Sequence, residues 1–194
     1  ERKININNIF DANRIGVDDT FEAGRSLTLG INYKNENSLD NSRFFEYNLA
    51  TVFRDNDEKN IPSQTSLNKK QSNIFGSINY NFSKYGNLEY NFAVDNNINN
   101  FEYNSISLGL SLNNFITKFN FIEEELQVGN TNIFENVSMY NFNENNMVSF
   151  KTRRNREINL TEYYDLVYEY KNDCLTAGIK YKKTYYQDRD IKPS

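Results

Sequence analysis

The sequence contains no histidine and no tryptophan, and its 194 residues include one cysteine and two prolines. Without histidine and with a single thiol, the chain has too few of the nitrogen and sulfur ligands that zinc sites require. The acidic clusters at 55–59, 123–125 and 188–190 have no neighbouring histidine base or activated nucleophile, which argues against acid–base catalysis. We therefore expect no enzyme activity, no metal centre and no cofactor.

Long apolar runs and an excess of basic residues are also missing. No apolar run approaches the roughly 20 residues of a membrane-spanning helix, and the first ten residues, ERKININNIF, have no signal-peptide core. The formal net charge is −4, and the one basic cluster is Arg153, Arg154 and Arg156 in RRNR. Nucleic-acid binding depends on a basic surface and is not expected here.

Aromatic residues and alternating patterns are what the chain does contain. There are 14 tyrosines and 15 phenylalanines, a level that disordered chains lack. In SLTLGINYK, residues 26–34, apolar and polar residues alternate with a period of two, which is typical of a strand with two different faces. About ten such segments recur along the chain. We expect their apolar residues to share one face of an antiparallel sheet, and these residues include Leu27, Leu29, Ile31, Tyr33, Phe45, Tyr47, Leu49, Leu88, Tyr90, Phe92, Ile133, Val137, Met139, Leu175, Ala177 and Ile179.

The length of the segments suggests an environment for the apolar face. Many run for about 8 to 15 residues, whereas strands of soluble proteins average about 5 to 6 residues. Transmembrane barrels need strands of about 9 to 11 residues with aromatic residues near both ends. Aromatic residues lie near segment ends at Tyr33, Phe53, Phe82, Tyr170 and Tyr181. We predict an all-β fold, a segment of an antiparallel up-and-down transmembrane β-barrel; a soluble all-β domain with a tyrosine-rich core is the alternative.

The connections between segments alternate in length. One alternate set contains residues 55–71 and 123–130, and the other contains the short stretches 83–87, 113–114, 143–146 and 171–173. Outer-membrane barrels have short periplasmic turns and longer outer loops, so Cys174 is expected at the periplasmic rim. The periplasm is oxidising, and an odd cysteine there indicates a disulfide partner outside this chain. The alternative is an inert cysteine that packs as a small apolar residue.

By the same alternation, Arg153, Arg154 and Arg156 lie near the outer rim. Guanidinium groups there could contact lipid phosphates. The alternative is that these three residues are ordinary rim charges.

Three stretches resemble a known family, and one of them, FKTRRN at residues 150–155, is similar to a strand end of that family. YEYKNDCLTAGIKYKKTYYQDRDIKP, residues 168–193, is similar to the carboxy-terminal signature of LptD, the lipopolysaccharide-assembly outer-membrane family also called organic solvent tolerance proteins, in its alphaproteobacterial form. IFDANRIGVDDTFEAGRSLTLGINY, residues 9–33, resembles another stretch of that family. The matching residues are Phe10, Asp11, Asn13, Arg14, Asp18, Glu22, Gly24, Arg25, Gly30, Arg153, Arg154, Tyr168, Asp173, Cys174, Thr176, Gly178, Tyr185, Tyr186, Asp188, Arg189, Asp190, Ile191, Lys192 and Pro193.

The resemblance implies a location, a function and partners. It implies that residues 1–194 are the carboxy-terminal part of a large barrel in the outer membrane of a Gram-negative bacterium, an incomplete barrel without the amino-terminal jellyroll, the first barrel half and the final strand. The whole protein would insert lipopolysaccharide into the outer leaflet, with the lipoprotein LptE as a plug and the periplasmic protein LptA as a bridge. Cys174 would form a disulfide with the amino-terminal region. The alternatives are another outer-membrane barrel, a porin or transporter, and a soluble secreted β-sheet adhesin.

Overall fold

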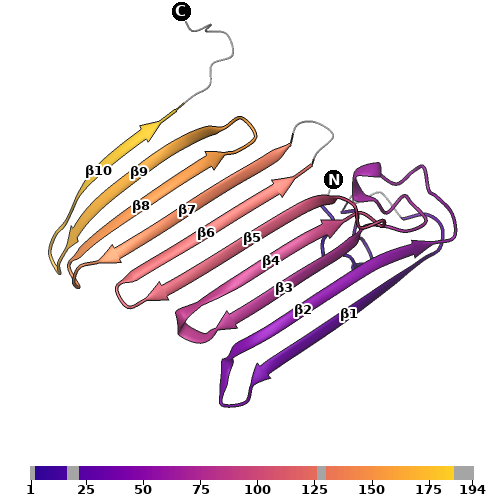
Figure 1. Cartoon of the computed structure of the whole chain (residues 1–194), viewed down its shortest axis with the longest axis horizontal. Coiled ribbons are helices and arrows are strands. Elements are labelled where there is room, and N and C mark those ends of the chain that lie inside the picture. The colour runs from indigo at the N-terminus through magenta and orange to yellow at the C-terminus, as the bar shows by residue number, and fades with distance from the viewer. Residues whose placement is uncertain (1–2, 17–21, 126–129, 186–194) are drawn as a thin grey trace, which may run out of the picture.

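The computed structural model describes residues 3–16, 22–125 and 130–185, and they contain one antiparallel β-sheet of ten strands (Figure 1). Each strand pairs with the next along the chain, so the order across the sheet is β1 to β10. The strands are β1 (Ser26–Asn37), β2 (Asp40–Arg54), β3 (Ile74–Phe82), β4 (Gly86–Val94), β5 (Phe101–Leu112), β6 (Phe115–Glu124), β7 (Thr131–Asn141), β8 (Asn146–Asn155), β9 (Leu160–Lys171) and β10 (Thr176–Thr184). The predicted all-β, up-and-down antiparallel fold of about ten strands is confirmed.

The sheet is open. β1 and β10 lie at its two ends (Figure 1), and within the described residues β1 pairs only with β2 and β10 only with β9. Two short 3₁₀ turns, Ser63–Thr65 and Ser83–Tyr85, complete the secondary structure of the described residues. An open up-and-down sheet is consistent with the predicted incomplete barrel.

Among the described residues, no helix has both the length and the apolar character needed to traverse a lipid bilayer.

Consecutive hairpins place the connections alternately at two edges of the sheet. The short-turn edge holds residues 38–39, 83–85, 113–114, 142–145 and 172–175. The long-loop edge holds residues 55–73, 95–100 and 156–159, together with residues 125 and 130, which follow β6 and precede β7. Between β5 and β6 the turn is Asn113 and Asn114 alone, and Asn113 has a left-handed φ of 50°, which asparagine tolerates better than most residues. The predicted grouping of the connections into two alternate sets is confirmed.

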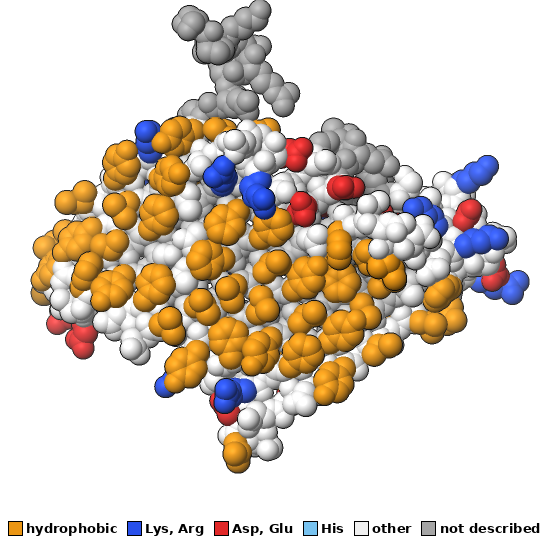
Figure 2. Space-filling model, viewed as in Figure 1, with side chains coloured by type: hydrophobic (Ala, Val, Ile, Leu, Met, Phe, Trp, Pro, Cys, Tyr) orange, Lys and Arg blue, Asp and Glu red, His pale blue; other side chains and the backbone are white. Residues whose placement is uncertain are grey.

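One face of the sheet is apolar from end to end, and we call it the apolar face. Figure 2 shows its hydrophobic side chains spread over the whole width of the sheet. Strand register aligns one large residue from each of β1 to β7 in a single row, followed by a second row over β8 to β10. The first row is Tyr33, Tyr47, Ile78, Tyr90, Ile106, Phe121 and Phe134, and the second is Phe150, Leu166 and Tyr181.

In β7 the predicted face is wrong. Ile133, Val137 and Met139 lie on the opposite side of the sheet, because the ladder pairs Phe121 with Phe134 and Phe115 with Tyr140. A strand whose pairing shifts by one residue exchanges all its side chains between faces, so register decides the matter. The apolar face of β7 therefore carries two aromatic residues with polar residues between them.

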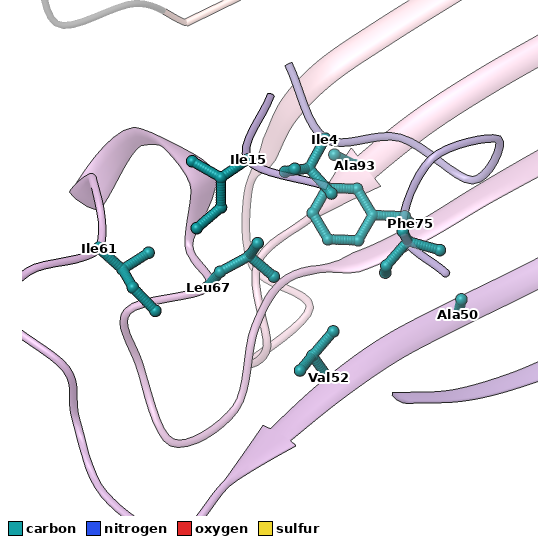
Figure 3. Packing of buried hydrophobic residues seen from close by; sticks show 9 residues of the cluster. Ile4, Ile15, Ala50, Val52, Ile61, Leu67, Phe75 and Ala93 are labelled. Carbon is teal, nitrogen blue, oxygen red and sulfur yellow. The ribbon is translucent and has the colours of Figure 1, made fainter. Parts of the chain in front are cut away.

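The opposite face, which we call the polar face, is covered only over part of the sheet. Residues 3–16 and the 55–73 loop fold over β2 to β4 at the long-loop edge and bury a hydrophobic cluster there (Figure 3). The cluster consists of Ile4, Ile9, Ile15, Ala50, Val52, Ile61, Leu67, Phe75 and Ala93. Small side chains on β2 and β4, Ala50 and Ala93, leave room for this layer. Elsewhere the polar face carries ladders of polar side chains, such as Asn48 donating to Ser77 Oγ at 3.1 Å.

Candidate membrane-facing surface and its edges

The apolar face is exposed although its residues are hydrophobic. Ile31 is 65% exposed and Ile179 is 74% exposed, and they come from strands at opposite ends of the sheet. Scattered exposed apolar residues are ordinary, but a contiguous apolar patch of this extent marks a surface that meets a partner or a membrane.

Aromatic side chains line the apolar face near both edges. Close to the short-turn edge, the ring centroids of Phe45 and Tyr80 lie 6.4 Å apart, and those of Tyr80 and Phe82 lie 5.4 Å apart. Close to the long-loop edge, Phe92 meets the ring of Phe101 edge-on at 6.3 Å. Aromatic residues near both interfaces are typical of the outer surface of transmembrane barrels, and in this sheet aromatic residues such as Tyr47 and Tyr90 also occupy the middle of the face.

The close approach of Phe92 to β3 depends on a glycine. A Cβ atom added to Gly76 would lie 2.3 Å from the ring of Phe92, so only glycine leaves room for the ring on the apolar face. The ring then covers backbone that would otherwise face the surroundings directly.

A polar cluster interrupts the apolar face over β6 and β7. Thr117 is 3% exposed and Asn136 is 8% exposed. The hydroxyl oxygens of Thr117 and Ser138 lie 2.8 Å apart. The Asn136 amide donates to Thr117 Oγ1 at 3.0 Å, and the Ser138 hydroxyl donates to Asn136 Oδ1 at 3.0 Å. Because these groups satisfy one another, the cluster fits among apolar side chains without stranded donors or acceptors.

Cys174 lies at the short-turn edge, in the turn between β9 and β10. Its side chain is exposed and its thiol is free. Asn172 shapes the turn, because its Oδ1 accepts hydrogen bonds from the backbone N–H of Cys174 at 3.0 Å and of Leu175 at 2.7 Å. The turn therefore presents the thiol to the surroundings, and the expected disulfide with a region outside this chain stays a prediction.

The three arginines of the basic cluster lie at the long-loop edge but on different faces. Arg153 is on the polar face, where its guanidinium lies 2.8 Å from Glu162 and 3.4 Å from Glu135. Arg154 and Arg156 share a hollow with Phe134 and Asn159. The ladder puts Phe134 on the apolar face, so this hollow opens there. The structure thus separates Arg153 from the other two arginines, and contact with lipid phosphate stays a prediction.

A buried ionic cluster on the polar face was not predicted from the sequence. Glu22 accepts a hydrogen bond from Arg14 Nε at 2.6 Å and forms a second ion pair with Arg54. Arg54 Nε also donates to the Leu67 carbonyl at 2.6 Å, and Arg14 Nη1 donates to Thr28 Oγ1 at 2.7 Å. The side chain of Arg14 is 6% exposed and that of Arg54 is 1% exposed. Burial lowers the pKa of Arg14, although arginine remains charged in proteins.

This cluster gives a structural role to several of the residues at 9–33 that carry the family resemblance. Arg14 and Glu22 are two of its three charged members, and Gly30 lies beneath the ring of Phe10. A Cβ atom on Gly30 would come within 2.5 Å of that ring. Arg54 carried no sequence signal of its own, because its partners lie far away along the chain. Asp18, Tyr186 and the residues 188–193 that carry the rest of the resemblance lie outside the described residues.

The sequence matches no protein-family model and no curated protein sequence. In the described ranges, no group of three or more Asp, Glu, Cys or His side chains is arranged to hold a metal ion. The fold therefore defines a class: an open, up-and-down β-sheet with one apolar and one polar face, consistent with part of a barrel wall.

Proposed function

We propose that this chain is part of the wall of an outer-membrane β-barrel that inserts lipopolysaccharide into the outer leaflet of a Gram-negative bacterium. The single observation that supports the membrane role is the exposed apolar face, which extends across all ten strands and has aromatic rows near both edges. Strands of 9 to 15 residues are long enough to cross the hydrocarbon core when tilted. A soluble adhesin would have to cover this face in another way.

The lipopolysaccharide part of the proposal rests on the resemblance to the LptD family. Its support is the combination of the quoted motifs at both ends with an exposed thiol at the short-turn edge. Short turns of such barrels face the periplasm, so a disulfide from Cys174 would reach a periplasmic region of the same protein.

The partners follow from the same proposal. The LptE plug would meet the polar face of β6 to β10, where the apolar side chains of Ile116, Val137 and Met139 lie among polar ones. Ile116 is 37% exposed, so a lumenal partner could bury it. LptA would act through the amino-terminal domain, which the resemblance implies.

The membrane orientation can be tested by thiol labelling of the full-length protein in intact cells. A membrane-impermeant maleimide should label Cys174 only after the outer membrane is opened and disulfides are reduced. In a Cys174→Ser background, Asn97→Cys at the long-loop edge should react in intact cells, whereas Asn143→Cys at the short-turn edge should not. Labelling of the two edges with the opposite preference, or extraction of the protein without detergent, would overturn the membrane role.

The lipopolysaccharide function is tested by depletion of the full-length protein. Newly made lipopolysaccharide should then fail to reach the cell surface and should accumulate in the inner membrane, because its exit is blocked. Normal surface lipopolysaccharide together with reduced uptake of small solutes would instead identify a porin or transporter. Non-reducing electrophoresis separates the same alternatives, since only the proposed function calls for a disulfide from Cys174.

A further inference from the structure

The side chains that line the hollow at the long-loop edge of the apolar face are of the kinds that bind lipid headgroups. Its lining combines the guanidinium groups of Arg154 and Arg156 with the ring of Phe134 and the amide of Asn159. Arg154 donates to Asn159 Oδ1 at 2.5 Å, which holds that side chain along the rim. The guanidinium of Arg156 lies 5.8 Å from the ring centroid of Phe121, on the apolar face.

The charges at this hollow are not neutralised by the described part of the chain. There, neither Arg154 nor Arg156 forms an ion pair, whereas Arg153 lies between two carboxylates on the other face. Glu123 is the acidic group facing the same edge from β6, and it accepts a hydrogen bond from Asn132 at 2.8 Å. The two guanidinium groups, which lie beside an apolar surface, are therefore available to bind an anion.

The place of the hollow selects the kind of anion. A free anion would gain nothing from the aromatic floor formed by Phe121 and Phe134, whereas a phosphorylated lipid could lay its acyl chains along the apolar face below. Phosphate oxygens suit the forked donors of two arginines. The acyl chains would follow the aliphatic and aromatic side chains of β7 to β9, such as Phe150 and Leu166.

We propose that Arg154 and Arg156 form a binding site on the outside of the sheet for the phosphate of a lipid in the leaflet at the long-loop edge. The inference rests on the proposed function, which makes this leaflet the outer one and the lipid a phosphorylated lipopolysaccharide. The site binds lipid at the outer wall and is separate from any path through the lumen.

The test is native mass spectrometry of the full-length protein in detergent, titrated with lipid A that carries its phosphates and with enzymatically dephosphorylated lipid A. Each charge-assisted contact contributes about 1.5 kcal/mol or more, so Arg154→Gln and Arg156→Gln should each weaken binding of phosphorylated lipid A about tenfold. Arg153→Gln is the matched control and should leave binding unchanged. Dephosphorylated lipid A should bind the wild-type protein and the double variant equally weakly.

Three results would overturn the proposal. Equal losses in Arg153→Gln and Arg154→Gln would indicate a general charge effect, and competition by millimolar inorganic phosphate would indicate a free-anion site. Unchanged binding in the double variant would place the lipid elsewhere. Thiol labelling could support the membrane orientation while the affinity for lipid A stays the same in the two arginine variants. In that case this inference fails and the proposed function stands.

Discussion

The two halves of the sheet share an apolar face and differ on the polar one. Over β2 to β4, residues 3–16 and the 55–73 loop bury Ile9 and Leu67 completely, both at 0% exposure, and lock this layer with the cluster around Glu22. In the described residues the polar face of β6 to β10 has no buried hydrophobic cluster, and residues 3–16 reach its border at β6, where Lys3 forms an ion pair with Glu124. Every residue of β10 is exposed. The first half thus contains a hydrophobic core on its polar side. The second half leaves both of its faces in contact with the surroundings.

The largest effect on the difference between the halves is expected from removing the negative charge at the centre of the buried cluster, because this should loosen the layer that covers the first half. Glu22→Gln leaves two buried guanidinium groups without their carboxylate, a change that typically costs about 4 kcal/mol. We expect residues 3–16 to lose hydrogen-exchange protection in detergent-solubilised protein while β6 to β10 keep theirs. Glu36→Gln, in an exposed pair with Lys34, is the control and should change little. Uniform loss of protection in both halves would contradict the difference between them.

Truncation of apolar residues compares the halves directly. Leu67→Ala removes a fully buried side chain and should cost about 3 kcal/mol of unfolding free energy. Leu166→Ala, at a residue of β9 that is 44% exposed on the apolar face, should cost about 1 kcal/mol because no cavity forms. Urea unfolding in micelles, followed by the fluorescence of tyrosine, measures both. Equal costs would show that the hydrophobic layer over β2 to β4 is not a packed core.

The polar cluster on the apolar face allows a test of what stabilises the second half. Asn136→Ala removes the amide that links Thr117 to Ser138, and we expect a loss of about 1.5 kcal/mol. Asn97→Ala, in an exposed turn, provides the baseline in the same unfolding measurement. A gain in stability for Asn136→Ala would mean that an apolar residue suits this position better.

The smallest effect is expected where residues 3–16 rest on β1. Gly30→Ala places a Cβ against the ring of Phe10, which is itself 60% exposed and can move, so the cost should be about 1 kcal/mol. Because the penalty is a contact between these two residues, it should largely disappear in the Phe10→Ala background. A double-mutant cycle measures this coupling. A cost that persists without the ring would instead reflect a backbone effect within β1.

Alternation predicted the strands and their order well because it is a local property. In β1, β2, β4 and β10 the large apolar residues themselves occupy every second position, so pattern and face coincide. β7 departs from this because Ile133, Val137 and Met139 form a better apolar series than the Asn136 and Ser138 that lie on the apolar face. There the register with β6 decides the face, and register depends on a partner strand that no single segment encodes.

The charged groups divide in the same way. The loop pattern was sufficient to put Cys174 at one edge of the sheet and Arg154 and Arg156 at the other, since hairpins alternate. Arg153 and Arg154 are neighbours in β8 and so face opposite sides of the sheet, and the register with β7, which pairs Arg154 with Phe134, decides which side each one takes. The Glu22 cluster joins residues from three separate stretches, so only the folded chain brings them together.

Within the described residues the outer edges of β1 and β10 have no partner strand, and this bears on how such a sheet could enter a bilayer. A strand edge exposes backbone donors and acceptors that hydrocarbon cannot satisfy, so each edge has to find another strand before or during insertion. The strands that dock there determine the circumference of the finished cylinder, because diameter grows with strand number. Pairing of the outer edges of β1 and β10 with other strands, rather than burial of any side chain, would then be the step that makes insertion into the bilayer stable.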